Sequence, residues 1–174
     1  MEVKVYVDLD ALQLVGSASN LNPVTGINLR RGDNTNVDVY FVQAGSVVSL
    51  GTGATVRFAA KEDGKYDAPL ILSGSTGSVT SSGNWFYRVA LDCNTTELNT
   101  LLGFNSGSTT FSSNDVELVE LTGEISYVKD TTEESTRPFT VTAENDLYRG
   151  DEGSPASANA YPGDNFILAL QVFS

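Results

Sequence analysis

Apolar and polar residues alternate along most of the chain, a period that places every second side chain on the same face of an extended strand. In the opening segment Val3, Val5 and Val7 alternate with polar or charged neighbours. The same alternation recurs in four further segments, 37–41, 55–61, 85–92 and 139–144. Strands of this kind bury one face against a second sheet and expose the other to water, so the pattern predicts an all-β sandwich.

The segment 116–129 changes phase part-way along. Val116 and Leu118 share one face, whereas the apolar positions from Val119 onward fall on the other. A slip of one residue moves side chains to the opposite face of a strand, so we expect a β-bulge or a bend near Leu118 to Leu121. The polar link 130–136 then turns the chain back into the last alternating segment, which predicts a long antiparallel hairpin.

One segment, 94–103, breaks the strand pattern. Asn94 or Thr95 can cap the start of a helix, three leucines follow at helical spacing, and Gly103 suits its end. The segment therefore predicts one short helix that closes an end of the sandwich.

The segment Asn165–Phe173 is apolar on both faces. A strand of this composition is covered on both sides, either as a central strand of the domain or beneath a partner subunit. It follows a long irregular stretch, 149–165, of the kind that is often functional. The candidate contact surface consists of Tyr148, Tyr161, Phe166, Ile167 and Phe173. No repeat or long linker divides the chain, which predicts a single domain over residues 1–174.

The net charge and the residue types that are missing argue against several classes of function. The 174 residues carry 22 Asp and Glu against 10 Lys and Arg, a formal charge of −12, and such a surface repels phosphate backbones. There is no His, so the commonest general base is missing, and the single cysteine, Cys93, is interpreted as a small buried residue. No glycine-rich phosphate loop or Gly-x-Ser-x-Gly elbow is present. We expect no enzyme activity, no catalytic residue, no metal, no cofactor and no nucleic-acid partner.

Targeting signals are also missing from the pattern. No basic start is followed by an apolar core, and no apolar run approaches the ~20 residues that a membrane span needs. We therefore expect synthesis in the cytoplasm and no membrane partner.

Three motifs allow both a functional and a structural interpretation. Two Arg-Gly-Asp triplets, 31–33 and 149–151, can bind integrins when displayed, but glycine beside a strand end favours a turn. Asp8 and Asp10 can bind calcium, but no Asp-x-Asp-x-Asp-Gly loop accompanies them, which favours a solvated acidic surface. The aromatic run 85–87 can stack on sugars, but its strand spacing favours the core.

Several stretches, spread over most of the chain, carry a family resemblance. The longest is Phe139–Asp146, continued by Arg149–Gly153. The others are Val15–Asn20, Leu29–Asp33, Phe58–Lys61, Gly64–Asp67 and Thr96–Gly103. Together they resemble the N-terminal domain of phage baseplate upper proteins, an immunoglobulin-like β-sandwich in which the Arg-Gly-Asp opening strand and the long hairpin are structural.

The resemblance implies an immunoglobulin-like antiparallel β-sandwich with one short helix, about 94–103, in a phage or prophage tail or baseplate. It implies a virion structural protein, made in the bacterial host cytoplasm, that docks to other tail subunits and to copies of itself. The alternative is a carbohydrate- or receptor-binding β-sandwich of a tail fibre or bacterial surface protein, which binds through loops at one end. A calcium-stabilised bacterial surface domain is a third hypothesis.

Overall fold

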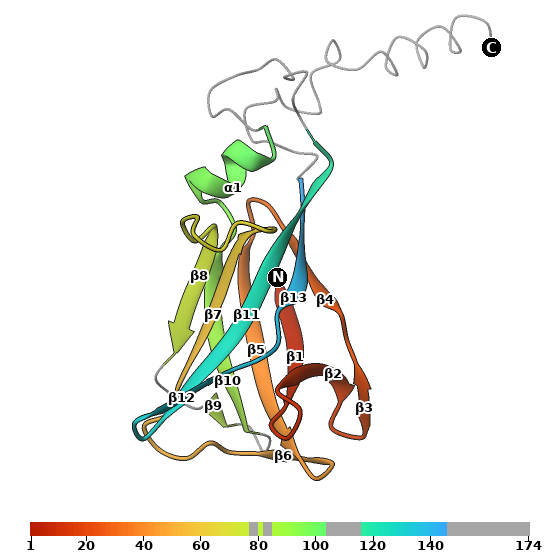
Figure 1. Ribbon diagram of the computed structural model, residues 1–174, viewed down its shortest axis with the longest axis vertical. Helices are drawn as coiled ribbons and strands as arrows, with labels where there is room; N and C mark the ends of the chain where they lie inside the picture. The colour runs from red at the N-terminus through yellow and green to blue at the C-terminus, as the bar shows by residue number, and fades with distance from the viewer. Residues whose placement is uncertain (77–79, 82–84, 104–115, 146–174) are drawn as a thin grey trace, which may run out of the picture.

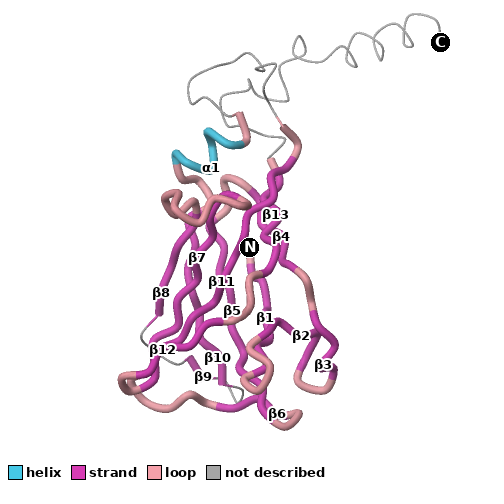
Figure 2. The backbone as a smooth tube through the Cα atoms, in the orientation of Figure 1, coloured by secondary structure: helices cyan, strands magenta, loops and turns pink. Residues whose placement is uncertain are grey.

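Two β-sheets lie face to face, and one short helix covers an end of the stack (Figure 1). The computed structural model describes residues 1–76, 80–81, 85–103 and 116–145. Figure 2 shows how strands dominate these residues. The predicted all-β sandwich with one short helix is confirmed.

The first sheet, sheet A, holds seven strands. In spatial order its path is β3 (Asn20–Pro23), β2 (Gln13–Ser17), β1 (Glu2–Asp8), β5 (Asn34–Gln43), β10 (Trp85–Asp92) and β9 (Thr80–Ser81). The seventh strand, β6 (Ser46–Val48), pairs with the end of β5.

The second sheet, sheet B, holds six strands. In spatial order its path is β4 (Gly26–Arg30), β13 (Phe139–Glu144), β11 (Leu118–Lys129), β7 (Thr55–Glu62) and β8 (Leu72–Thr76). The sixth strand, β12 (Thr132–Ser135), pairs with the end of β11. The chain thus returns from β11 through β12 to β13, which confirms the predicted hairpin.

Both sheets are mixed, whereas the sequence led us to expect antiparallel pairing throughout. β1 pairs with β5 in parallel, and β4 pairs with β13 in parallel; the other pairings among the described strands are antiparallel. In sheet A the chain makes the β2–β3 hairpin and crosses to sheet B as β4 before it returns as β5. This excursion separates β1 from β5 and allows the two to run in the same direction.

The predicted bulge in β11 is wrong. Its pairing with β13 runs in unbroken register from Leu118 to Gly123, and its pairing with β7 continues to Val128. Val119, Leu121 and the following odd-numbered positions face the other sheet, while Leu118 points outward and is 44% exposed. The apparent change of phase comes from exposed apolar residues at the start of the strand, not from a slip in register.

The inward faces of the two sheets form one core. Its largest fully buried side chains are Tyr87, Phe41, Phe58, Leu29, Leu72, Leu91, Leu98, Leu102, Leu121 and Ile125. The phenol of Tyr87 is satisfied inside this core because its oxygen accepts a hydrogen bond of 2.9 Å from the Leu50 N–H. Cys93 is also fully buried, as predicted.

The predicted helix is α1 (Thr96–Leu101). The hydroxyl of Thr95 caps it by accepting the N–H of Leu98 at 3.2 Å, and Gly103 follows it with a positive φ of 75°. Leu98 and Leu102 turn inward and join the core. The helix therefore closes one end of the sandwich, as expected from the sequence.

The first Arg-Gly-Asp triplet forms the turn between β4 and β5. Gly32 has a φ of 85°, and the mostly buried Arg31 donates from Nε to the Asn145 side chain at 3.0 Å. The structural interpretation of this triplet is confirmed. The second triplet, 149–151, lies outside the described residues.

Candidate docking groove

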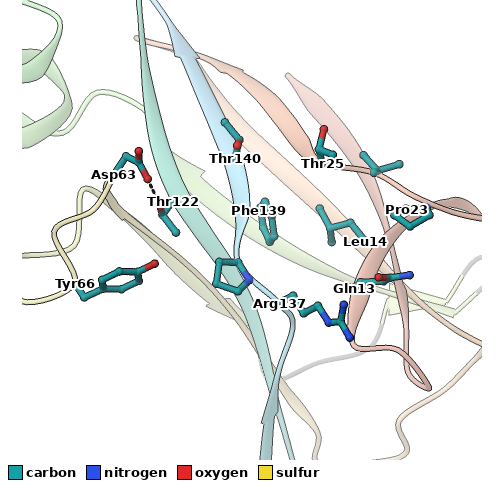
Figure 3. Close-up of a pocket in the computed structure, with 12 residues that line it drawn as sticks. Gln13, Leu14, Pro23, Thr25, Asp63, Tyr66, Thr122, Arg137, Phe139 and Thr140 are labelled. Carbon is teal, nitrogen blue, oxygen red and sulfur yellow. Dashed lines mark hydrogen bonds between the residues drawn. The ribbon is translucent and has the colours of Figure 1, made fainter.

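A groove of about 420 Å³ crosses the outward face of sheet B (Figure 3). Thr122 on β11 and Thr140 on β13 form its floor, on the side of the sheet opposite the core residues Leu121 and Val141. Leu14 and Phe139 also line it. Its volume lies within the range of small-molecule and peptide sites, about 300–1,000 Å³.

The turn after β7 forms one wall. Asp63 is fixed to the floor because its carboxylate accepts a hydrogen bond of 2.7 Å from the Thr122 hydroxyl. Gly64 adopts a φ of 71°, and the Lys61 ammonium donates to the Tyr66 carbonyl. These contacts hold the turn while the Tyr66 side chain stays 67% exposed above the groove.

The opposite wall is the segment that leads from β3 into β4, together with Gln13. Backbone hydrogen bonds tie it to neighbouring elements. The N–H of Val24 donates to the Leu14 carbonyl at 2.9 Å, and the N–H of Thr140 donates to the Thr25 carbonyl at 2.9 Å. Arg137 lies between the walls, and its own N–H donates to Leu12 at 2.7 Å. The wall is therefore anchored to both sheets.

The groove continues at both ends. A second hollow of about 270 Å³ shares Tyr66, Thr122 and Pro138 with the first and extends to Leu70. A third, the lateral slot, has about 290 Å³, shares Leu14 and Val24 with the first, and runs between β1, β2 and β4. We call the first two hollows the docking groove. Because neighbouring hollows share residues, the three form one long depression.

The chemistry of the docking groove combines apolar contact with hydrogen bonding. Val24, Tyr66 and Leu70 are 39%, 67% and 45% exposed along it. Asp63, Gln13 and Arg137 add a carboxylate, an amide and a guanidinium. Within the described residues, no group of three or more His, Cys, Asp or Glu side chains is placed to hold a metal ion. The arrangement is suited to binding through shape, apolar contact and hydrogen bonds.

The outward face of sheet A carries two cross-strand rows. The first is aromatic: Tyr40 stacks on Tyr6 with ring centroids 4.9 Å apart and contacts Phe86 at 5.5 Å. Burial raises the pKa of Tyr40 above its usual value. The rings of Tyr40 and Phe86 are mostly covered, so the row offers little open surface.

The second row is charged. Arg88 binds the buried carboxylate of Asp38 through two hydrogen bonds of 2.7 Å, and it also contacts Glu2 at 3.1 Å. The hydrogen bonds to Asp38 raise the pKa of Arg88. The guanidinium also lies over the Phe86 ring, 5.6 Å from its centroid. The charged groups of this row therefore pair with one another within sheet A.

The sequence-based site residues have three different outcomes. Tyr148, Tyr161, Phe166, Ile167 and Phe173 lie outside the described residues. Of the aromatic run, Tyr87 lies in the core as predicted, whereas Phe86 is buried on the outward face of sheet A and Trp85 is 46% exposed. Trp85 is the first residue of β10 and lies at the margin of the core. The solvated surface expected at Asp8 and Asp10 is wrong for Asp8, which is buried and whose carboxylate accepts the N–H of Asp10 at 3.0 Å.

Sequence reasoning missed the docking groove. Its residues come from five separated parts of the chain, around positions 13, 24, 64, 122 and 138. The one local signal of an exposed contact residue was the turn that contains Gly64 and Tyr66. An aromatic side chain in a polar turn does not lie on the buried face of a strand and is therefore expected to be exposed. The convergence of the other residues depends on the sheet topology.

Comparison with known proteins found similarity to solved structures but no match by sequence. A scan against protein-family models gave no match, and a search of curated proteins gave none. The chain is similar to the N-terminal domain of phage TP901-1 ORF48, with 14% identity and a TM-score of 0.41, over 82% of this chain and 98% of that one. It is also similar to the cysteine protease inhibitor EhICP2 from Entamoeba histolytica, with 9% identity and a TM-score of 0.33, over 83% and 97%. Neither likeness decides a function.

The described helix is far shorter than a membrane span. No helix among the described residues is long and apolar enough to cross a bilayer.

Proposed function

We propose that this protein is a structural component of a phage or prophage tail or baseplate that acts by docking to neighbouring subunits. The observation that carries the proposal is the docking groove with its exposed apolar side chains, Val24, Tyr66 and Leu70. Exposed apolar groups gathered in one depression are typical of a contact surface. The sequence resemblance to baseplate upper proteins is the reason for proposing a phage tail or baseplate as the assembly.

The shape of the depression indicates the kind of partner. Its hollows follow one another across the face of sheet B, with Tyr66 at the junction of the first two. A long, shallow path of this kind suits an extended segment of a neighbouring subunit better than a compact ligand. Tyr66 and Leu70 would supply apolar contact, and Arg137 and Gln13 would hydrogen-bond the segment's backbone.

The acidic composition fits a subunit that must remain unaggregated before assembly. A formal charge of −12 makes free copies repel one another. A specific contact must then be strong enough to overcome this repulsion, which favours partners that bury apolar side chains in the groove.

The proposal is tested by incorporation into tail particles. Particles from a strain that expresses the chain should contain it at a fixed copy number, measured by quantitative mass spectrometry. Tyr66→Ala should lower that copy number severalfold, because it removes the most exposed apolar contact of the groove. Leu118→Ala is the matched control, since Leu118 is 44% exposed and outside the groove. Wild-type protein missing from purified particles would contradict the proposal.

The second candidate function, saccharide binding, has its own supporting observation. Tyr66 stands beside Asp63 and faces Arg137 and Gln13 across the first hollow, so an aromatic ring and planar polar groups surround one space. Sugars bind through ring stacking and hydrogen bonds of this kind. A glycan array tests it: specific binding that Tyr66→Ala abolishes would favour this function over subunit docking.

A further inference from the structure

The lateral slot opens at the side of the sandwich where the edges of two strands are unpaired. Its walls are largely apolar, with Val3, Val5, Val15, Val24 and Ile27 among the lining residues. A cavity of about 150 Å³ accommodates a benzene ring. The slot, at about 290 Å³, therefore has room for about two apolar side chains from outside.

The edge of β4 beside the slot offers free backbone groups. The Thr140 N–H donates to the Thr25 carbonyl and the Arg31 N–H donates to the Glu144 carbonyl, so the odd-numbered residues of this stretch face β13. In a parallel pair, alternate residues direct both backbone groups to opposite sides. The backbone N–H and C=O groups of Gly26 and Asn28 therefore point away from β13. Among the described residues, no backbone group bonds to them.

The facing edge of β1 is open as well. The Met1 carbonyl accepts a hydrogen bond from the Asn36 N–H. The odd-numbered residues of β1 therefore direct their backbone N–H and C=O groups towards β5. β2 covers the other side of β1 only from Tyr6 to Asp8. Lys4, which lines the slot, therefore directs its backbone groups to the uncovered side.

The described strands leave no gap inside either sheet for a further strand. Every strand along the described path of each sheet is hydrogen-bonded to the next, so an additional strand can join only at an edge. Among the described edges, β9 has two residues, and β3 is fully exposed and ends in Pro23, which lacks an N–H. At β8 the sheets approach closely, since a Cβ on Gly74 would lie 2.6 Å from the Ala90 carbonyl oxygen. The β4 edge combines free backbone groups with adjacent apolar space.

We propose that the β4 edge and the lateral slot receive the segment Phe166–Phe173 of a second copy of this chain, added as a β-strand. Both faces of the segment are apolar, and a strand at an edge has only one face over the slot. In an exchange between two copies, the body of the donor covers the other face. The segment 146–165 spans up to about 70 Å when extended, which is enough to reach a neighbour. This inference rests on the proposed docking function and names a self-contact for it.

The first test blocks the edge. Asn28→Pro removes the outward N–H of Asn28 without removing a bond to β13, and Asn28→Thr keeps that N–H. Light scattering of the full chain should show wild-type and Asn28→Thr protein self-associating equally. The dissociation constant of Asn28→Pro should rise about tenfold or more. Equal association of all three proteins would overturn the proposal, and circular dichroism verifies that each is folded.

The second test identifies the donor. The chain carrying Asn28→Cys is mixed with the chain carrying Leu168→Cys under mild oxidation, with Ser75→Cys on β8 as the control edge. A disulfide-linked pair with Asn28→Cys but not with Ser75→Cys supports the proposal. If the chain carrying both Asn28→Cys and Leu168→Cys forms the bond only within itself, the second copy is ruled out. No bond in any mixture also overturns the proposal. Cys93 is buried and should not interfere.

The failures of the two proposals are distinguishable. If Asn28→Pro associates normally while Tyr66→Ala is lost from tail particles, the docking function holds and the strand exchange is wrong. If the chain is missing from tail particles but Asn28→Pro still disrupts self-association, the strand exchange holds and the assembly is of another kind.

Discussion

At the scale of single residues, the polar groups next to the core show how burial changes their chemistry. The Tyr127 hydroxyl is largely buried and donates a hydrogen bond to the Glu134 carboxylate. Burial disfavours the phenolate, and the nearby carboxylate disfavours it further, so the pKa of Tyr127 rises to about 12. The Tyr127 ring also packs edge-on against Phe41, with centroids 5.2 Å apart. One side chain thus links core packing to the β11–β12 hairpin.

This raised pKa predicts alkaline sensitivity. The pKa in the folded state, about 12, exceeds the unfolded value near 10. The stabilisation is therefore fully present below pH 10 and is lost as the pH rises towards 12. Urea unfolding across this range should show Tyr127→Phe losing less stability than wild type. Parallel pH profiles for wild type and Tyr127→Phe would contradict the interpretation.

Cys93 predicts a second behaviour at this scale. Burial raises the pKa of its thiol, which is fully covered and lies 3.8 Å from the Thr35 hydroxyl. Because the thiolate is the reactive form, the native protein should react with a thiol reagent only as fast as it opens. In denaturant the reaction should be complete at once. Rapid full labelling of native protein would show that the site is accessible.

At the scale of elements, local sequence signals worked where the decisive contacts are local. Thr95, Gly103 and the leucine spacing specify α1, and the alternating segments specify strands. Such signals do not determine which strands pair, because alternation indicates which face of a strand is buried and not which strand lies beside it. The parallel pairs of β1 with β5 and β4 with β13 therefore could not be predicted. The false bulge in β11 has the same origin, since exposed Leu118 imitates a change of face.

The cap of α1 predicts a measurable contribution. Thr95 accepts the Leu98 N–H and donates to the Ile71 carbonyl at 3.0 Å, so it joins the helix to the segment before β8. Thr95→Ala should lower the free energy of unfolding by about 1 kcal/mol, measured in urea. Thr95→Ser retains the hydroxyl and should lose much less; equal losses would point to the methyl group instead.

The close approach of β8 to β10 predicts a larger effect. A Cβ at Gly74 would meet the Ala90 carbonyl oxygen at 2.6 Å and a Val89 methyl at 2.7 Å. Gly74→Ala should therefore lower the free energy of unfolding by about 1–3 kcal/mol through overpacking. The neighbouring exposed position provides the control, because Ser75→Ala should change stability by less than about 0.5 kcal/mol. An unchanged Gly74→Ala protein would mean that the two strands separate easily.

At the scale of the whole molecule, the docking groove appears only after both sheets are assembled. Tyr66, Gln13 and Arg137 each look like ordinary loop residues in the sequence. Their convergence follows from the chain crossing from sheet A to sheet B near Thr25 and from the segment between β12 and β13, where the Arg137 N–H bonds to the Leu12 carbonyl. Composition alone predicts one global property, a strongly acidic molecule, and this charge bears on the self-association proposed above.

The acidic charge and the apolar contact together predict the salt dependence of self-association. Raising ionic strength from about 0.01 M to about 1 M shortens the Debye length from about 30 Å to about 3 Å. Repulsion between copies of charge −12 then fades, while apolar contact persists. Light scattering should show tighter association at high salt. Weaker association at high salt would instead indicate contacts made mainly by ion pairs.

The partnership of β4 with β13 also sets the order of events during protein synthesis. Arg31, just after β4, bonds to Asn145, just after β13, across a separation of 114 residues. The ribosome releases β4 long before it has synthesised β13. The apolar residues Ile27 and Leu29 of β4 therefore lack their neighbouring strand during this interval. Strand pairing over such long separations is slow and leaves nascent chains prone to aggregation. Nascent chains should therefore expose the apolar face of β4 until residue 144 has emerged.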